Sequence, residues 1–169
     1  RCMSLNRPPL RSPRPRNHVD SRRVVSRETA SRLPPDSLAW AMRTAAGLIV
    51  AVQEGQSLNE LFERRSEGWP DVRRATVRDL AWRTLREFGR GDFILAACLS
   101  KPLPADVHAM LLIALTRLAA RPQDTHTTVD QAVDAVAASV PGLRAVANGV
   151  LRRVLREWPE WQARIDQDA

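Results

Sequence analysis

From residue 34 onward, apolar residues recur along the chain at the spacing of helix faces. In residues 38–53, apolar side chains occupy positions i, i+3, i+4 and i+7 over four turns, after a Pro-Asp-Ser start signal and before Gly55. No segment shows the strict alternation of a half-buried strand. The pattern therefore predicts an all-α fold, a bundle of about seven helices. The other six are expected after Ser57, over 71–88, over 92–99, from Pro104 to about 120, over 129–138 and from 141 to about 158.

Short polar and glycine motifs set the predicted boundaries. Ser57 and Thr128 each precede a Glu or Gln by three residues, the spacing of a capping box. Residues 89–91, Gly-Arg-Gly, are predicted to form a turn, and Pro104 suits the first turn of the fifth helix. That helix is apolar nearly all round, which predicts that it lies at the centre of the bundle.

The last predicted helix has an unusual middle. Residues 146–156 are amphipathic, with arginines on the polar side and the poor helix formers Asn148 and Gly149 between them. A glycine inside a helix costs about 1 kcal/mol relative to alanine. We expect this cost to be offset either by another helix packed closely on Gly149 or by a hydrogen bond from Asn148 to backbone. The segment indicates a compact helical fold and an anionic partner.

The positive charge is unevenly distributed. Residues 1–33 contain nine arginines and two acidic residues, whereas residues 34–169 contain 17 basic and 17 acidic side chains. Together with its prolines, this composition predicts a disordered basic leader at 1–33 and a charge-balanced folded domain at 34–169. The leader could be an arm that gathers RNA phosphates, an organelle transit peptide, or a terminus without a role.

Residues for catalysis are scarce. Cys2 and Cys98 form no disulfide framework or zinc motif, and His108 and His126 have no partner at metal-ligand spacing. No phosphate loop, dinucleotide-binding unit or nucleophile elbow is present. We therefore predict no catalytic, cofactor-binding or metal site. The chain also has no apolar run of 18 residues and no secretory signal, so we expect a cytoplasmic protein without a membrane partner.

Two groups of arginines are candidates for binding phosphate. Arg74 and Arg78 are four residues apart in the third helix, and Arg152, Arg153 and Arg156 crowd the end of the last one. Each group alone is also typical of a solvated helix face with paired charges. They would form one phosphate-binding strip only if the two groups adjoin in space.

Three segments together resemble a known family. Residues 48–58 (LIVAVQEGQSL), 78–86 (RDLAWRTLR) and 147–153 (ANGVLRR) are similar in sequence and order to the N-terminal NusB-like domain of the ribosomal RNA small subunit methyltransferase B family. The resemblance covers about residues 38–158. The chain departs from the family pattern in two places. Residues 116–120 replace a more aromatic Tyr-Gln-Leu pattern, and Thr127 and Thr128 replace small residues.

The resemblance implies a NusB-like fold of two packed helical sub-bundles that binds ribosomal RNA. In full-length relatives, a C-terminal domain uses S-adenosylmethionine and a cysteine nucleophile to methylate carbon 5 of a cytosine. That domain is not part of this sequence, and Cys98 lacks the Pro-Cys setting of the nucleophile. We therefore expect no cofactor in this chain, and we expect it to be one domain of a longer protein rather than a truncated product or a free-standing protein.

The predicted function is an RNA-binding accessory domain whose partners are ribosomal RNA and its own methyltransferase domain. The alternative is a NusB-type transcription antitermination or protein-interaction module that binds RNA and a ribosomal protein. In either case the domain could also brace a catalytic neighbour. Arg86, Arg152 and Arg153 match the family motifs. The candidate RNA-binding residues are Arg74, Arg78, Arg86, Asn148, Arg152, Arg153 and Arg156.

Overall fold

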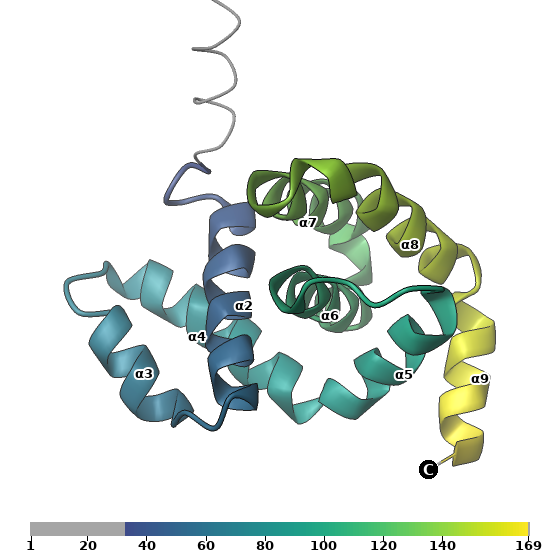
Figure 1. Cartoon of the computed structure of the whole chain (residues 1–169), viewed down its shortest axis with the longest axis horizontal. Coiled ribbons are helices and arrows are strands. Elements are labelled where there is room, and N and C mark those ends of the chain that lie inside the picture. Colours follow the sequence, from purple (N-terminus) through teal and green to yellow (C-terminus); the bar gives the residue numbers. More distant parts are fainter. Residues whose placement is uncertain (1–32, 169) are drawn as a thin grey trace, which may run out of the picture.

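The computed structural model describes residues 33–168, and in that range the chain is all-α, as the apolar spacing predicts (Figure 1). The predicted leader falls outside the described residues except for Leu33. Two short 3₁₀ turns, Pro122–Asp124 and Pro141–Leu143, precede α7 and α8. The α-helices are α2 (Leu38–Gln53), α3 (Leu58–Arg65), α4 (Asp71–Arg86), α5 (Phe88–Cys98), α6 (Ala105–Ala120), α7 (Thr125–Ser139), α8 (Arg144–Arg156) and α9 (Trp158–Asp168).

Helix α6 forms the centre of the core, which confirms the prediction from its composition. Its side chains from Met110 to Leu115 are at most 2% exposed. Helices α2, α4, α5, α7 and α8 all contact it. Each large apolar side chain buried here stabilises the fold by about 1.5–3 kcal/mol relative to an exposed position. The apolar surface of α6 on all sides is therefore explained by neighbours on all sides.

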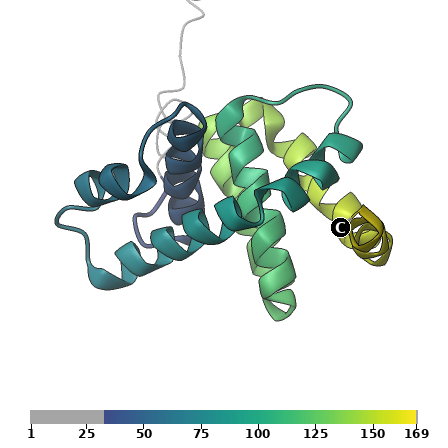
Figure 2. The ribbon, with the colours of Figure 1, turned by 90° about the horizontal axis from the view of Figure 1, so that it is seen from below.

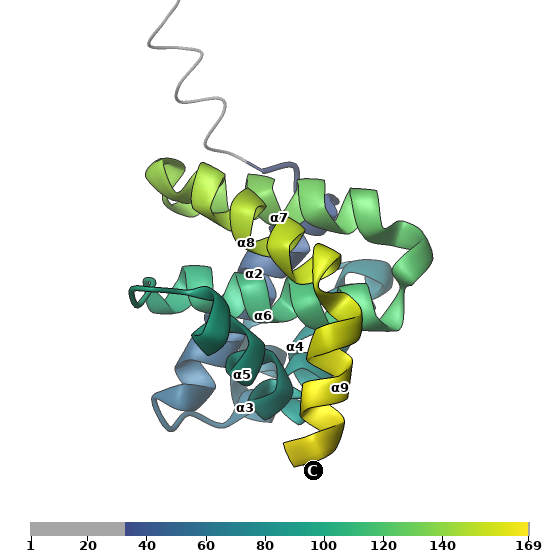
Figure 3. The same ribbon diagram turned by 90° about the vertical axis from the view of Figure 1, so that its right-hand side faces the viewer.

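The remaining helices form two groups around α6. Helices α2, α3 and α4 contact one another on one side of it, and α7 and α8 pack together on the other (Figures 1 and 2). Helix α5 packs across α6 and reaches α8, while α9 continues from the end of α8 (Figure 3). This arrangement agrees with the expected pair of sub-bundles. The C-terminal ends of α4 and α8 approach each other near the start of α5, since Glu87 and Trp158 line the same pocket.

Helix starts follow the sequence signals in some cases only. The Ser37 hydroxyl accepts a hydrogen bond from the Trp40 backbone N–H at 3.1 Å, which confirms the predicted start of α2. The Ser57 capping box is wrong, because its side chain makes no cap hydrogen bond although α3 begins directly after it. The Thr128 cap is also wrong. Helix α7 already begins at Thr125, and Thr128 is fully buried on the face that packs into the core.

The predicted turn at residues 89–91 is wrong, because these residues lie in the first turn of α5. A Cβ atom added to Gly91 would lie 2.8 Å from Leu112 Cδ2. This glycine therefore allows α5 to approach α6 closely and does not reverse the chain. Pro104 precedes α6 as its N-cap residue, one position before the predicted helix position.

The prediction ended the last helix near Trp158, but the structure has a break at Glu157 and a further helix, α9. Trp161 anchors α9 because its side chain is 3% exposed and joins the main core. The weak apolar pattern of residues 158–168 gave no clear periodic signal for a separate helix. Trp158 and Ile165 pack against the core beside Trp161, so three apolar side chains dock this helix.

Candidate nucleic-acid interface

Helix α8 has one buried and one open face. Four apolar residues, Ala147, Val150, Leu151 and Val154, are buried against the core. On the opposite side, Ala145, Gly149, Arg152 and Arg156 are spaced by three or four residues and are all exposed. The exposed face of α8 therefore carries two small residues, Ala145 and Gly149, followed by arginine side chains at the C-terminal end of the helix.

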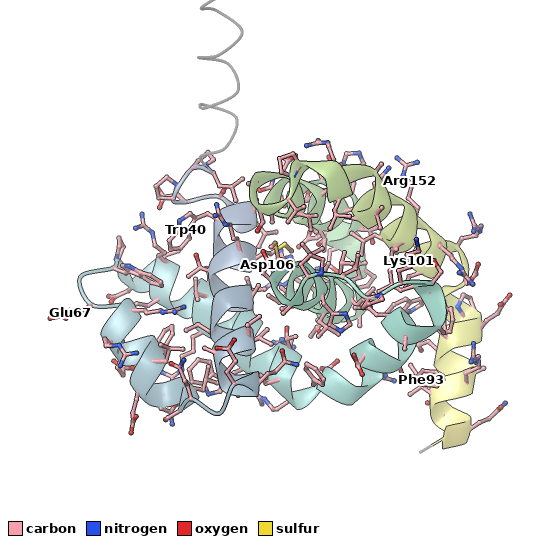
Figure 4. All side chains as sticks on the ribbon, in the orientation of Figure 1. Trp40, Glu67, Phe93, Lys101, Asp106 and Arg152 are labelled. Atoms are coloured by element: carbon pink, nitrogen blue, oxygen red, sulfur yellow. The ribbon has the colours of Figure 1, made fainter. Side chains whose placement is uncertain are left out.

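The two proposed compensations for Gly149 are both wrong. No atom lies within 4 Å of the position its Cβ would take, so no helix packs on it. The Asn148 side-chain oxygen accepts a hydrogen bond from Arg152 Nε at 3.1 Å, and it does not bind backbone. The apolar packing of the buried face of α8 therefore offsets the free-energy cost of Gly149 within the helix. Figure 4 shows the Arg152 side chain pointing away from the core.

The arginines at the end of α8 differ in their ion pairs. Arg153 Nε lies 3.2 Å from both carboxylate oxygens of Glu157, and Arg156 Nη2 lies 3.5 Å from one of them. Arg152 has no carboxylate within 4.0 Å among the described residues, and its partner is the neutral Asn148. Two of these three guanidinium groups therefore share one carboxylate, and the uncompensated charge is largest at Arg152.

Among the candidate arginines of α4, Arg74 is bound more firmly than Arg78 and Arg86. Arg74 donates hydrogen bonds to the Ser66 hydroxyl at 2.6 Å and to Glu63 at 2.8 Å, and its guanidinium carbon lies 5.3 Å from the Phe62 ring centroid. Arg78 lies over the Trp82 ring at 5.3 Å, and Arg86 Nε reaches the Trp82 carbonyl at 3.4 Å. Arg78 and Arg86 are exposed and form no ion pair with a described residue. They retain more donors than Arg74.

The two arginine groups do not adjoin. Helix α4 packs on α2 and α6, whereas α8 packs on α7, α5 and α6. Helix α6 lies between α4 and α8 in Figures 1 and 2. The condition for one continuous phosphate-binding strip is therefore not met for Arg74 and Arg78, because α4 and α8 pack on α6 and not closely on each other.

Sequence reasoning missed a polar hollow of about 210 Å³ between α4 and α6. Burial, and then the neighbouring charge of Arg121, lower the pKa of the Arg117 guanidinium. The available signal was a single arginine, Arg117, in the largely apolar C-terminal half of α6. The polar side chains that line the hollow are Asp79, Arg83, Thr84, Thr116, Arg117 and Arg121.

Other titratable groups do not assemble into a site. His108 Nε2 pairs with Asp92 at 2.9 Å, and His126 Nδ1 with Asp130 at 3.2 Å. Within residues 33–168, no three His, Cys, Asp or Glu side chains are grouped so that they could hold a metal ion. Cys98 lies half-buried beside the core, where burial raises the pKa of its thiol. None of the described helices has the length and apolar character needed to cross a membrane.

Comparison with known proteins agrees with this architecture. The chain is 26% identical over 119 residues to the ribosomal RNA small subunit methyltransferase B of Escherichia coli O6:H1. The aligned region covers 68% of this chain and 28% of that protein. Proteins of the same name from Shigella boydii serotype 18 and Escherichia fergusonii are 25% and 26% identical with the same coverage. The chain therefore spans just over a quarter of the length of these curated relatives. Residues 40–156 match the NusB family, and because this is well over half of the chain, the chain belongs to that family.

Proposed function

We propose that this domain binds RNA through the C-terminal end of α8 and serves as the RNA-binding accessory domain of a ribosomal RNA cytosine-5 methyltransferase. The observation that carries the proposal is the Arg152 guanidinium, which is held by Asn148, points outward and has no carboxylate partner among the described residues. It lies in the segment that carries the family motif, and similar proteins are named for an activity on ribosomal RNA.

The geometry suits a phosphate group. Arg152 uses Nε for Asn148, so both of its terminal nitrogens can donate to two oxygens of one phosphate. Gly149 and Ala145 lie on the same exposed face, where their small size permits close approach of a sugar-phosphate backbone. Arg153 and Arg156 can exchange Glu157 for phosphate at small cost, because exposed ion pairs contribute only about 0–1 kcal/mol.

The candidate arginines on α4 differ in how many N–H donors remain free to bind phosphate. Arg78 and Arg86 are exposed and unpaired among described residues, so they can add phosphate contacts. Arg74 has fewer donors to spare, since Ser66 and Glu63 already bind it. Contacts of this kind position an RNA and do not select its sequence. Choice of the target cytosine therefore falls to other parts of the full-length protein.

The proposal assigns catalysis to a domain outside this chain. S-adenosylmethionine and the cysteine nucleophile would belong to that domain, and the described helices would hold the ribosomal RNA for it. Cys98 does not suit the nucleophile role, because burial raises the pKa of its thiol and reduces the thiolate fraction.

The alternative, a module whose main partner is a protein, predicts a contiguous exposed apolar patch and arginines fully paired with acids. The large apolar side chains that are clearly exposed in the described range are Val72 and Val146, which lie on different helices. Arg152 is not paired with an acid within residues 33–168. Both observations favour RNA over a protein partner for this face.

The test is binding of a labelled small-subunit ribosomal RNA fragment, measured by fluorescence anisotropy over a series of salt concentrations. We expect a steep fall in affinity with salt. A variant with Arg152, Arg153 and Arg156 changed to Gln should bind more weakly and lower the logarithmic salt slope by about 0.7 per lost contact to a single strand. The matched control changes the exposed Arg43, Arg64 and Arg65 to Gln, which removes the same charge elsewhere. Equal losses in the two variants would contradict the proposal.

A further inference from the structure

The hollow between α4 and α6 lies outside the α8 surface and has a polar lining of its own. Three arginines surround it: Arg83 from α4, Arg117 from α6 and Arg121 directly after α6. Asp79 pairs with Arg83 at 3.0 Å, and Asp124 is shared between Arg117 at 3.5 Å and Arg121 at 3.8 Å. Two carboxylates therefore face three guanidinium groups, so one positive charge is left without a counterion.

Thr84 provides a second, independent observation. Its side chain lines the hollow and is 1% exposed, and its hydroxyl has no hydrogen-bond partner. Three other helical threonines, Thr44, Thr76 and Thr116, donate to the carbonyl four residues earlier. The Thr84 hydroxyl does not make this local bond. Because an unpaired buried hydroxyl destabilises the folded state, an acceptor that enters the hollow would relieve a real cost.

Arg117 is in a similar position. Its Nε is also buried without a partner, and its guanidinium is mostly buried. Burial and the nearby charge of Arg121 both lower its pKa, which shows that this environment disfavours the charged form. An anion placed beside Arg117 and Arg121 would compensate the positive charge that Asp124 leaves unbalanced.

We propose that this hollow binds a single phosphate group, with Arg117 and Arg121 donating to its oxygens and the Thr84 hydroxyl donating a further hydrogen bond. The volume of about 210 Å³ is below the ~300–1,000 Å³ typical of sites for drug-sized ligands, so the hollow suits a group as small as phosphate. The phosphate can come from inorganic phosphate or from an RNA backbone. The proposal does not depend on RNA binding by α8.

The experiment is an isothermal titration of the whole chain with inorganic phosphate, against potassium chloride at equal ionic strength. We expect saturable binding. Thr84→Val keeps the shape of the side chain and removes the donor, so it should lower phosphate affinity about tenfold and raise the thermal midpoint in the absence of phosphate. Arg117→Gln should abolish binding.

Thr44→Val is the matched control, because its hydroxyl is already bonded to the Trp40 carbonyl and lies outside the hollow. It should leave phosphate affinity unchanged and should not raise the thermal midpoint. A general salting effect of phosphate would act on every variant alike. A wild-type chain without saturable binding, or a Thr84→Val variant that binds phosphate as tightly as wild type, would overturn the proposal.

A second arm identifies the source of the phosphate. If an RNA backbone phosphate occupies the hollow, Thr84→Val weakens binding of a single-stranded RNA, and inorganic phosphate competes with that RNA. If free phosphate occupies it, Thr84→Val changes phosphate affinity and leaves RNA affinity unchanged. Both results support a phosphate site, and the phosphate titration remains interpretable even if the chain binds no RNA at all.

Discussion

The arginines of α4 and those of α8 are the same residue type in two different environments. In α4, Arg73 pairs with Asp36 at 2.8 Å and lies over Trp40, and Arg74 is held by Glu63, Ser66 and Phe62. In α8, Arg152 meets only a neutral amide. Arg73 and Arg74 of α4 therefore fasten helices together, whereas Arg152 of α8 keeps its charge available. The number of arginines in a segment does not measure the charge that it can offer a partner.

The sharpest test of this contrast is Arg74→Ala. It should lower the free energy of unfolding by about 2 kcal/mol, because it leaves the buried Ser66 hydroxyl unpaired and removes the cation over Phe62. Urea denaturation measures the change. An effect below about 0.5 kcal/mol, the usual range for surface sites, would show that the contacts of Arg74 are not structural.

Arg152→Gln is the counterpart in α8. Its unfolding free energy should stay within about 0.5 kcal/mol of wild type, while affinity for the ribosomal RNA fragment falls several-fold, up to about tenfold. Arg153→Gln should have a smaller effect on RNA affinity, because Glu157 already neutralises part of the Arg153 charge. Anisotropy titrations at low salt measure both, and the reverse ranking would contradict the assignment of free charge to Arg152.

Gly149→Ala separates stability from binding within α8. The residue is helical, exposed and free of neighbours within 4 Å, so alanine should stabilise the domain by about 1 kcal/mol. If an RNA backbone passes over this position, the added methyl group lowers RNA affinity at the same time.

Gly91→Ala is the opposite case. Its Cβ would lie 2.8 Å from Leu112, and overpacking should destabilise the domain by about 1–3 kcal/mol.

Asn148→Ala should have the smallest effect. It frees Arg152 from its hydrogen bond at 3.1 Å without removing any charge. We expect RNA affinity to fall about two- to threefold through lost orientation, and stability to rise by a few tenths of a kcal/mol because alanine is the better helix former. An affinity loss as large as that of Arg152→Gln would mean that Asn148 contacts the RNA itself.

The sequence alone determined the helical class, the central position of α6 and the start of α2. These follow from local rules: apolar spacing selects helices, an all-apolar helix needs neighbours on all sides, and Ser37 caps the backbone next to it. The sequence also identified residues 147–153 as a candidate site, because a glycine within an arginine-bearing helix can be recognised without a structure.

Only the tertiary structure decided which arginines are free and which polar residues meet. Asp36 and Arg73, or Thr84 and Arg117, are more than 30 residues apart, and no local pattern predicts that they lie together. The same holds for the two glycines, since Gly91 is needed for contact with Leu112 and Gly149 faces open space. Helix formation depends on neighbours in sequence, whereas burial, pairing and packing depend on neighbours in space.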